Sequence, residues 1–207
     1  MVNTDLECSL FEKGYKNIIG FDEAGRGPLA GPIVSGYVFL SQDELNNNLD
    51  LVPYINDSKK LTHKKRKELS DEIKKRFRSG VSMIDNTQID KIGIQTANVK
   101  IVENIIYKHE NEIDYALIDY IGGFKKYFGL EFQNYKTIVD GDAKHFLIAA
   151  ASIVAKVFRD EYMENISTDF PEYGFEKHYG YGTKGHIENI KKYGMCSLHR
   201  KSFIHFL

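Results

Sequence analysis

The chain has 207 residues, of which 42% are hydrophobic and 28% are charged, a balance that predicts one globular domain with a substantial core. No apolar run approaches the roughly 20 residues that a membrane helix needs, and the first residues lack the apolar stretch of a secretion signal. The two cysteines cannot build a zinc site without histidine. We therefore expect a cytoplasmic protein with no membrane partner.

Charge is distributed unevenly along the chain, although the net charge is only −1. Residues 1–58 contain nine acids and three cations, residues 59–78 contain ten cations and three acids, and residues 174–207 contain six cations and two acids. Separate acidic and basic segments can hold metal ions and phosphates together. The same pattern arises when lysine and arginine simply solvate one helix face, so charge alone leaves both interpretations open.

The first predicted strand is the apolar run 17–21, which leads directly into Asp22 and Glu23. A second strand is predicted over 33–40. The loop between the two strands contains two prolines, which cannot pair in a central strand and therefore mark its limits.

The next predicted elements are a helix and a third strand. Residues 46–48 are three asparagines, and we expect them to form a polar loop. Thr62 is a suitable N-cap for a helix over 63–78, and Ser79-Gly80 would end that helix before a strand over 81–84.

The second half of the chain alternates between helices and strands. Residues 94–108 have apolar side chains at helical spacing, and short apolar runs predict strands over 115–118 and 135–139. A long helix with small residues in its middle is predicted over 145–163, and a final amphipathic helix over 184–193.

The order of these elements predicts an α/β fold with a mixed central sheet flanked by helices. We expect residues 1–207 to form a single domain. Within it, about 17–165 would form the α/β core, and about 166–207 would form a small C-terminal helical extension.

Acidic residues stand at the carboxyl ends of three predicted strands: Asp22 and Glu23, then Asp119, then Asp140 and Asp142. Binding sites in open α/β sheets form at these strand ends. Carboxylates that converge there repel one another and need cations, and Mg²⁺ and Mn²⁺ prefer carboxylate and water ligands. Each acid alone could equally be a solvated strand terminus, and the sequence does not show that they converge.

A glycine-rich loop, residues 24–32, follows the first two acids directly. Gly25 and Gly27 flank Arg26, so the backbone can approach a ligand closely and the arginine can meet a phosphate or a sugar. The loop lacks the GxxxxGK[ST] and GxGxxG patterns of common nucleotide-phosphate loops. A tight turn between two strands is the alternative interpretation.

These motifs make the sequence resemble ribonuclease HII, the type 2 ribonuclease H family. The resemblance extends in the family's order over nearly the whole chain. The matching stretches are 20–32, 57–61, 116–119, 141–143, 149–157 with 159–160, 177–178 with 180–184, and 199–200 with 202–203.

The resemblance implies a ribonuclease H-like fold and an endonuclease that uses two ions of Mn²⁺ or Mg²⁺. It implies cleavage on the 5′ side of a ribonucleotide, in RNA–DNA hybrids or in duplex DNA that contains ribonucleotides, leaving a 3′-hydroxyl and a 5′-phosphate. It implies a role in ribonucleotide removal, and no obligatory protein partner is evident. The metal-binding, catalytic residues that it implies are Asp22, Glu23, Asp119 and Asp142.

The resemblance also implies that Gly25, Arg26, Gly27 and Tyr181 recognise the ribose. RNA differs from DNA at the 2′-hydroxyl, so discrimination needs hydrogen-bonding groups near that atom. The alternative interpretation of Tyr181 is an aromatic side chain that only packs within its loop. Six further candidates for contact with the substrate are Lys59, Lys60, Ser152, Lys156, Arg159 and Lys184.

The structural alternatives for these six are simple ones. Lys156 and Arg159 could be surface charges of the long helix. Ser152 could serve only as a small residue that allows the helix to pack closely. Two residues depart from the usual family pattern: Tyr120 stands where a glycine is usual, and Asp140 where a lysine is usual. Asp140 adds an acid beside the predicted metal site, so it could change the metal requirement or simply point away.

Two other classes of function remain open at this point. A junction-resolving nuclease of the same fold would cut branched DNA, and the ribose-sensing loop argues against it. A nucleic-acid-binding protein without activity would keep the acids as remnants. No serine–histidine–acid pairing is visible among the seven histidines, so we expect metal rather than nucleophilic catalysis.

Overall fold

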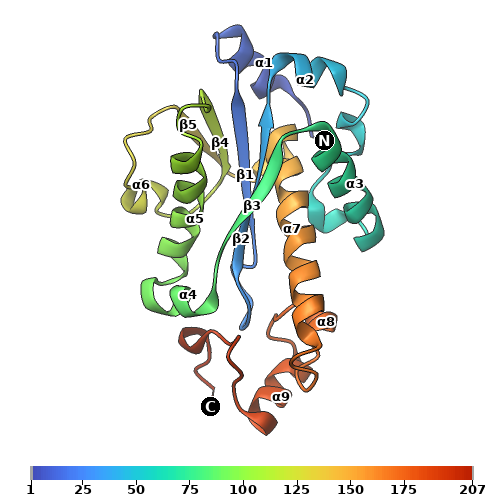
Figure 1. Ribbon diagram of the computed structural model, residues 1–207, viewed down its shortest axis with the longest axis vertical. Helices are drawn as coiled ribbons and strands as arrows, with labels where there is room; N and C mark the ends of the chain where they lie inside the picture. The colour runs from blue at the N-terminus through green and yellow to red at the C-terminus, as the bar shows by residue number, and fades with distance from the viewer. Residues whose placement is uncertain (1, 207) are drawn as a thin grey trace.

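The computed structural model describes residues 2–206, and its centre is one five-stranded sheet with helices on both sides (Figure 1). The strand order is β3-β2-β1-β4-β5. Strand β1 pairs antiparallel with β2 and parallel with β4, so the sheet is mixed, as predicted. The strands are β1 (Ile18–Ala24), β2 (Ile33–Leu40), β3 (Ser79–Ile84), β4 (Tyr115–Asp119) and β5 (Tyr135–Ile138).

One long helix, α7, crosses β1 and β2 on one face of the sheet beside α3, and α5 lies on the other face (Figure 1). The helices are α1 (Asp5–Glu12), α2 (Gln42–Asn47), α3 (His63–Arg76), α4 (Asn86–Ile92), α5 (Ile94–Lys108), α6 (Phe124–Tyr127), α7 (Phe146–Ser167), α8 (Phe175–His178) and α9 (Lys184–Tyr193). Short 3₁₀ turns are Val52–Tyr54, Ser58–Lys60, Gly141–Ala143 and Lys201–Phe203.

The sheet separates two hydrophobic cores. Successive side chains of a strand point to opposite faces, so neighbouring residues of one strand join different cores. Ile18 and Leu117 pack with α7 and α3, whereas Ile19 and Ile118 pack with α5. This three-layer arrangement leaves the carboxyl ends of β1 and β4 free to carry functional groups.

Two glycines of the strands face helix α7 and let it pack closely on the sheet. A methyl group at Gly20 would lie 2.6 Å from the Leu147 side chain, and one at Gly36 would collide with the Ala151 carbonyl oxygen. The small residues predicted for the middle of this helix serve the same close contact. The packing brings Ser152 of α7 against the end of the sheet that carries the acids.

The C-terminal extension forms a third, smaller cluster at one end of the molecule, where α8 and α9 lie (Figure 1). The buried members of this cluster are Ala30, Met163, Tyr173, Phe175 and Ile190. Ala30 belongs to the glycine-rich loop, so the extension packs directly against that loop.

Helix α7 continues past its predicted end at 163 to Ser167, and α3 ends at Arg76 before its predicted end at 78. Two strand boundaries are also wrong, and strand pairing explains both. Strand β1 continues to Ala24, so Asp22 and Glu23 lie within the strand, because they pair with β2. Ser79 and Gly80 begin β3 instead of ending the helix before it, because they pair with β2 as well.

Five helices were not predicted: α1, α2, α4, α6 and α8. They have between four and eight residues each, which is too short for an apolar period to be visible. The expected polar loop at 46–48 is partly wrong, since α2 extends to Asn47. A capping box between Ser41 and Glu44 begins that helix, and Leu45 is its one buried residue.

Glu7 on α1 is a fully buried carboxyl group at the N-terminal end of α7. Its Oε1 accepts the Leu147 N–H at 2.9 Å, whereas its Oε2 has no hydrogen-bond partner in the described part of the chain. Burial raises the pKa of Glu7 from 4.5 to about 7, although the bond from Leu147 opposes this change. The folded protein therefore holds this proton more tightly than the unfolded chain between these two pH values.

We expect Glu7→Gln to stabilise the protein near pH 8 but not near pH 5. Because folding raises the pKa of this acid from 4.5 to about 7, the free energy of unfolding falls as pH rises through this range. The fall is about 3 kcal/mol in total. Glutamine does not ionise and avoids this loss, and its unpartnered amide N–H offsets part of the gain, leaving about 2 kcal/mol. Urea unfolding in EDTA across this pH range measures the difference.

The matched control is Glu12→Gln, because Glu12 is exposed at the end of the same helix. This control should leave the pH dependence of unfolding unchanged. A gain from Glu7→Gln that is equal at every pH would contradict the assignment of a buried, ionising carboxyl group.

Candidate active site

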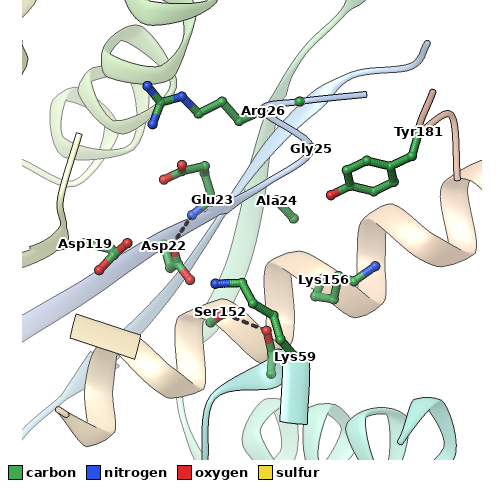
Figure 2. Close-up of a pocket in the computed structure, with 12 residues that line it drawn as sticks. Asp22, Glu23, Ala24, Gly25, Arg26, Lys59, Asp119, Ser152, Lys156 and Tyr181 are labelled. Atoms are coloured by element: carbon green, nitrogen blue, oxygen red, sulfur yellow. Dashed lines mark hydrogen bonds between the residues drawn. The ribbon is translucent and has the colours of Figure 1, made fainter. Parts of the chain in front are cut away.

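Three carboxylates from two neighbouring strands meet at one end of the sheet. Asp22 and Glu23 stand near the end of β1, and Asp119 is the last residue of β4. The two strands are parallel neighbours, with Phe21 paired to Ile118, so their carboxyl ends coincide. One oxygen of each carboxylate lies within 4.8 Å of the others, and Figure 2 shows the three side chains gathered together.

Asp142, the fourth acid of the prediction, lies beside this cluster and is also buried. Its Oδ2 is 3.2 Å from Lys59 Nζ. The preceding residue, Gly141, donates its N–H to Asp119 Oδ1 at 2.8 Å, which ties the turn to the end of β4. After the larger effect of burial, the charge of Asp142 helps to raise the pKa of Asp22 and of Asp119.

Burial and repulsion make these acids costly to ionise together. Burial, followed by the charges of Glu23 and Asp119, raises the pKa of Asp22 well above its usual range. Burial and the charge of Asp119 raise the pKa of Glu23 to about 7. Glu23 Oε2 is also buried without a hydrogen-bond partner in residues 2–206. A divalent cation would supply both the missing charge and the missing bond, so the donor set fits a metal site.

The acids form part of the wall of a pocket of about 230 Å³. Other parts come from the glycine-rich loop, the 3₁₀ turn Ser58–Lys60, helix α7 and the C-terminal extension (Figure 2). The lining residues are Asp22, Glu23, Ala24, Gly25, Arg26, Gly27, Ser58, Lys59, Asp119, Ser152, Lys156 and Tyr181. Segments far apart in the sequence therefore meet around the acidic cluster.

Most residues expected to contact the substrate lie on this pocket. The seven that line it are Gly25, Arg26, Gly27, Lys59, Ser152, Lys156 and Tyr181. Lys60 and Lys184 lie outside it, with largely exposed side chains 3.9 Å from Asp57 and 4.0 Å from Glu188. The remaining one, Arg159, is buried.

Arg159 is only 1% exposed, so it is neither a surface charge of α7 nor open to a phosphate. Its Nε donates to Pro32 O at 3.0 Å, and its terminal nitrogens donate to Tyr179 O at 3.0 Å and Ala30 O at 3.3 Å. The expected phosphate contact therefore does not fit this geometry. Arg159 joins the glycine-rich loop to the C-terminal extension.

Tyr181 is the aromatic group of the pocket and is 43% exposed. Figure 2 shows its hydroxyl directed into the pocket. The ring lies 5.9 Å from the guanidinium carbon of Arg159, and the backbone carbonyl accepts a hydrogen bond from His186 Nδ1 at 2.9 Å. The backbone of this tyrosine is thus fixed while its ring stays accessible.

The pocket's polar groups on α7 are held by neighbours. Ser152 Oγ lies 3.0 Å from Ser58 Oγ, and Lys156 Nζ lies 2.6 Å from Asp160 Oδ1. Burial lowers the pKa of Lys156, while the bond to Asp160 opposes this effect. Figure 2 shows Lys156 and Lys59 on the side of the pocket away from Arg26.

The two departures from the family pattern lie outside the cluster. Asp140 has a left-handed backbone with φ of 54° and an exposed carboxylate 3.7 Å from Lys144. Of the alternatives considered for it, pointing away from the acids is the one that this geometry supports. Tyr120 is exposed immediately after Asp119.

Asn98, a buried residue of α5 next to Glu23, is not among the site residues predicted from the sequence. Burial has the largest effect and raises the pKa of Glu23, whereas the Asn98 side chain lowers it. No hydrogen bond of standard geometry joins the two side chains. Its position could have been noticed, because Asn98 occupies the same helical stripe as the apolar Ile101, Val102 and Ile105. A polar residue on a buried stripe marks a site worth testing.

Comparison with known proteins agrees with this site. The family model for ribonuclease HII matches residues 19–206. The ribonuclease HII of Endomicrobium trichonymphae is 45% identical over 196 residues, which cover 94% of this chain and 89% of that protein. None of the helices in the described residues is long and apolar enough to cross a membrane.

Solved structures share the fold. Ribonuclease HII of Archaeoglobus fulgidus, solved in complex with PCNA, superposes with a TM-score of 0.73 at 26% identity, covering 90% of this chain and 95% of that one. Bst-RNase HIII in complex with Mn²⁺ superposes with a TM-score of 0.68 at 19% identity, and the match covers 86% of this chain and 63% of that one. With the family model and the curated relatives in agreement, the chain belongs to the ribonuclease HII family of metal-dependent endoribonucleases.

Proposed function

We propose that this protein hydrolyses the phosphodiester bond on the 5′ side of a ribonucleotide, leaving a 3′-hydroxyl and a 5′-phosphate. Its substrates would be RNA–DNA hybrids and duplex DNA that contains single ribonucleotides. The observation that supports this most strongly is the meeting of Asp22, Glu23 and Asp119 in a pocket that also contains the glycine-rich loop and Tyr181. Its cellular role would be ribonucleotide removal in the cytoplasm.

The four acids are proposed to bind two ions of Mn²⁺ or Mg²⁺. Asp22, Glu23 and Asp119 would provide ligands from the cluster, and Asp142 would complete the set. When bound, such ions lower the pKa of water and stabilise the attacking and leaving oxygens. The presence of Mn²⁺ in Bst-RNase HIII, which has the same fold, is consistent with this proposal.

The chain's own polar groups would bind and orient the nucleic acid. Backbone groups of Gly25–Gly27 and the Tyr181 hydroxyl, which line the pocket, would meet the 2′-hydroxyl, the group by which RNA differs from DNA. Lys59 and Lys156 would contact phosphates near the scissile bond. Burial raises the pKa of Asp22, and the Ser152 hydroxyl opposes this by favouring the charged carboxylate. Ser152 would therefore help to orient Asp22.

Contacts beyond the pocket would hold the duplex without reading its sequence. Lys60 and Lys184 are exposed outside the pocket and are suited to phosphate contacts. The extension of about 166–207 would grip the duplex as part of the single domain 1–207. Because the Archaeoglobus relative forms a complex with PCNA, a protein partner is compatible with this fold, and none is needed for the proposed chemistry.

A DNA duplex with one ribonucleotide tests the proposal. With Mn²⁺ or Mg²⁺, we expect a single nick on the 5′ side of the ribonucleotide and no nick in EDTA. The matched controls are the same duplex in all-DNA form and a branched all-DNA junction. Cleavage of the junction instead would favour a resolvase, and metal-independent binding without turnover would favour an inactive binding protein.

A further inference from the structure

Arg200 is a fully buried arginine of the C-terminal extension, and no carboxylate within residues 2–206 forms an ion pair with it. Its guanidinium donates instead to three carbonyls of the glycine-rich loop. Nε donates to Gly31 O at 2.9 Å, and the terminal nitrogens donate to Arg26 O at 3.0 Å and Gly25 O at 2.6 Å. A buried charge without a counter-ion is expensive, so this arrangement needs a functional explanation.

The extension also pairs with the same loop through its backbone. Leu29 donates its N–H to Gly180 O at 2.8 Å, and Arg200 donates its own N–H to Leu29 O at 2.8 Å. Gly31 donates to Leu198 O at 2.9 Å. These bonds fix the later part of the loop, whereas Gly25 and Arg26 are held to the extension by the Arg200 side chain.

The bonds from Arg200 determine which way two peptide groups face. In a trans peptide, the C=O of one residue and the N–H of the next point in opposite directions, and none of the described peptide bonds is cis. The carbonyls of Gly25 and Arg26 point toward Arg200, so the N–H groups of Arg26 and Gly27 point away from it. Neither N–H has a protein acceptor in the described residues, and both residues line the pocket with the acids.

We propose that Arg200 is a positioning residue for ribose recognition, which fixes the N–H groups of Arg26 and Gly27 as two donors directed into the pocket. This inference rests on the proposed function. The donors suit an acceptor such as the 2′-hydroxyl oxygen or the phosphate beside it. A loop held in this orientation before binding does not have to be ordered by the substrate.

An arginine is required because two carbonyls of successive residues must be held at once. The planar guanidinium presents its N–H groups in a fixed fork, whereas a lysine ammonium is a single point of charge on a flexible stem. Arg200→Lys should keep the positive charge and lose the simultaneous hold on Gly25 and Arg26. The loop would then sample peptide orientations in which the donors face elsewhere.

The test compares the affinity of wild type and Arg200→Lys for two duplexes that differ by one 2′-hydroxyl. Binding is measured in Ca²⁺, with a gel to verify that neither strand is cut. We expect the preference of wild type for the duplex with one ribonucleotide to fall by at least about 10-fold in the variant. Affinity for the all-DNA duplex should change by less than about 2-fold, because phosphate contacts dominate it.

The matched control is Ile190→Ala, which weakens the core of the same extension but keeps the Arg200 side chain and its bonds to Gly25 and Arg26. It should retain the ribonucleotide preference. Arg200→Lys with full preference, or an equal loss in the control, would overturn the role of Arg200. Absence of any preference in wild type would instead overturn the proposed function, and the Arg200 role with it.

Amide hydrogen exchange of wild type provides a test that needs no variant to fold. The amide protons of Arg26 and Gly27 should exchange readily in the free protein and become protected when the ribonucleotide duplex is added. The all-DNA duplex should protect them less. Strong protection of both amides in the free protein would show that they do not face the pocket, and would overturn the inference.

Discussion

Asp119→Asn is expected to reduce cleavage at least about 1000-fold while leaving the protein folded. Loss of a residue that merely supports a metal ligand typically costs 10- to 100-fold, so loss of a central ligand should cost more. Asp119 contributes an oxygen to the three-carboxylate cluster and is the last residue of β4, where an amide of the same shape fits the backbone equally well. Single-turnover cleavage of a duplex with one ribonucleotide measures the loss.

The same substitution should stabilise the protein when metal is absent. Asp119 is a cause of the raised pKa of both Asp22 and Glu23, after burial, so its removal relieves repulsion in the cluster. Thermal unfolding in EDTA should therefore show a higher midpoint for the variant. With saturating Mn²⁺, the wild type should gain more stability than the variant, because it binds the metal more tightly.

Asp140→Asn is the control for Asp119→Asn, since it removes an acid from the same region without touching the cluster. We expect its cleavage rate to stay within about 2-fold of wild type. Full activity in Asp119→Asn, or an equal loss in both variants, would refute the assignment of the metal ligands.

Tyr181→Ala is expected to weaken cleavage at a single embedded ribonucleotide by roughly 30-fold, which corresponds to about 2 kcal/mol for the loss of one stacked aromatic group. On a continuous RNA strand paired with DNA, the loss should be smaller, because several registers place a ribose in the pocket. Tyr181 is accessible beside the acids, and its backbone is held by His186, so truncation should remove the ring without moving the loop.

Two further substitutions separate the roles of this side chain. Tyr181→Phe keeps the ring and removes the hydroxyl, so it should recover whatever part of the loss is due to stacking. Tyr193→Ala removes another exposed aromatic of the extension, one that lies outside the pocket, and should leave both activities unchanged. An equal loss on both substrates in Tyr181→Ala would indicate a general packing role.

The sequence predicts the parts of this fold that depend on local patterns. The apolar run 33–40 coincides with β2, which is buried on both faces, and the helical spacing of 94–108 coincides with α5, whose apolar stripe is buried. The convergence of Asp22 and Asp119 is less direct. It follows from parallel pairing of β1 and β4, which no local pattern specifies, and here the resemblance to ribonuclease HII supplied what periodicity could not.

Buried arginines show where prediction from sequence stops. The sequence makes Arg159 a candidate for phosphate contact or for a surface charge of the long helix, and it predicts no specific role for Arg200. Apart from Tyr179 O, which also accepts from Arg159, their acceptors are backbone carbonyls of the glycine-rich loop, 127 to 175 residues away along the chain. Carbonyls are present at every residue, and only the folded arrangement shows which of them a guanidinium reaches.

The glycines at the interface between β1, β2 and α7 have a consequence for how the enzyme tolerates change. Because Gly20 and Gly36 leave no slack beneath α7, any larger residue at either position would lift the helix from the strands. The helix carries Ser152 and Lys156, whereas the strands carry the acids, so such a lift would widen the groove in which the scissile phosphate must fit. The spacing between helix and sheet at the site is therefore set by two glycines, one of which, Gly36, pairs with Asp22 across the two strands.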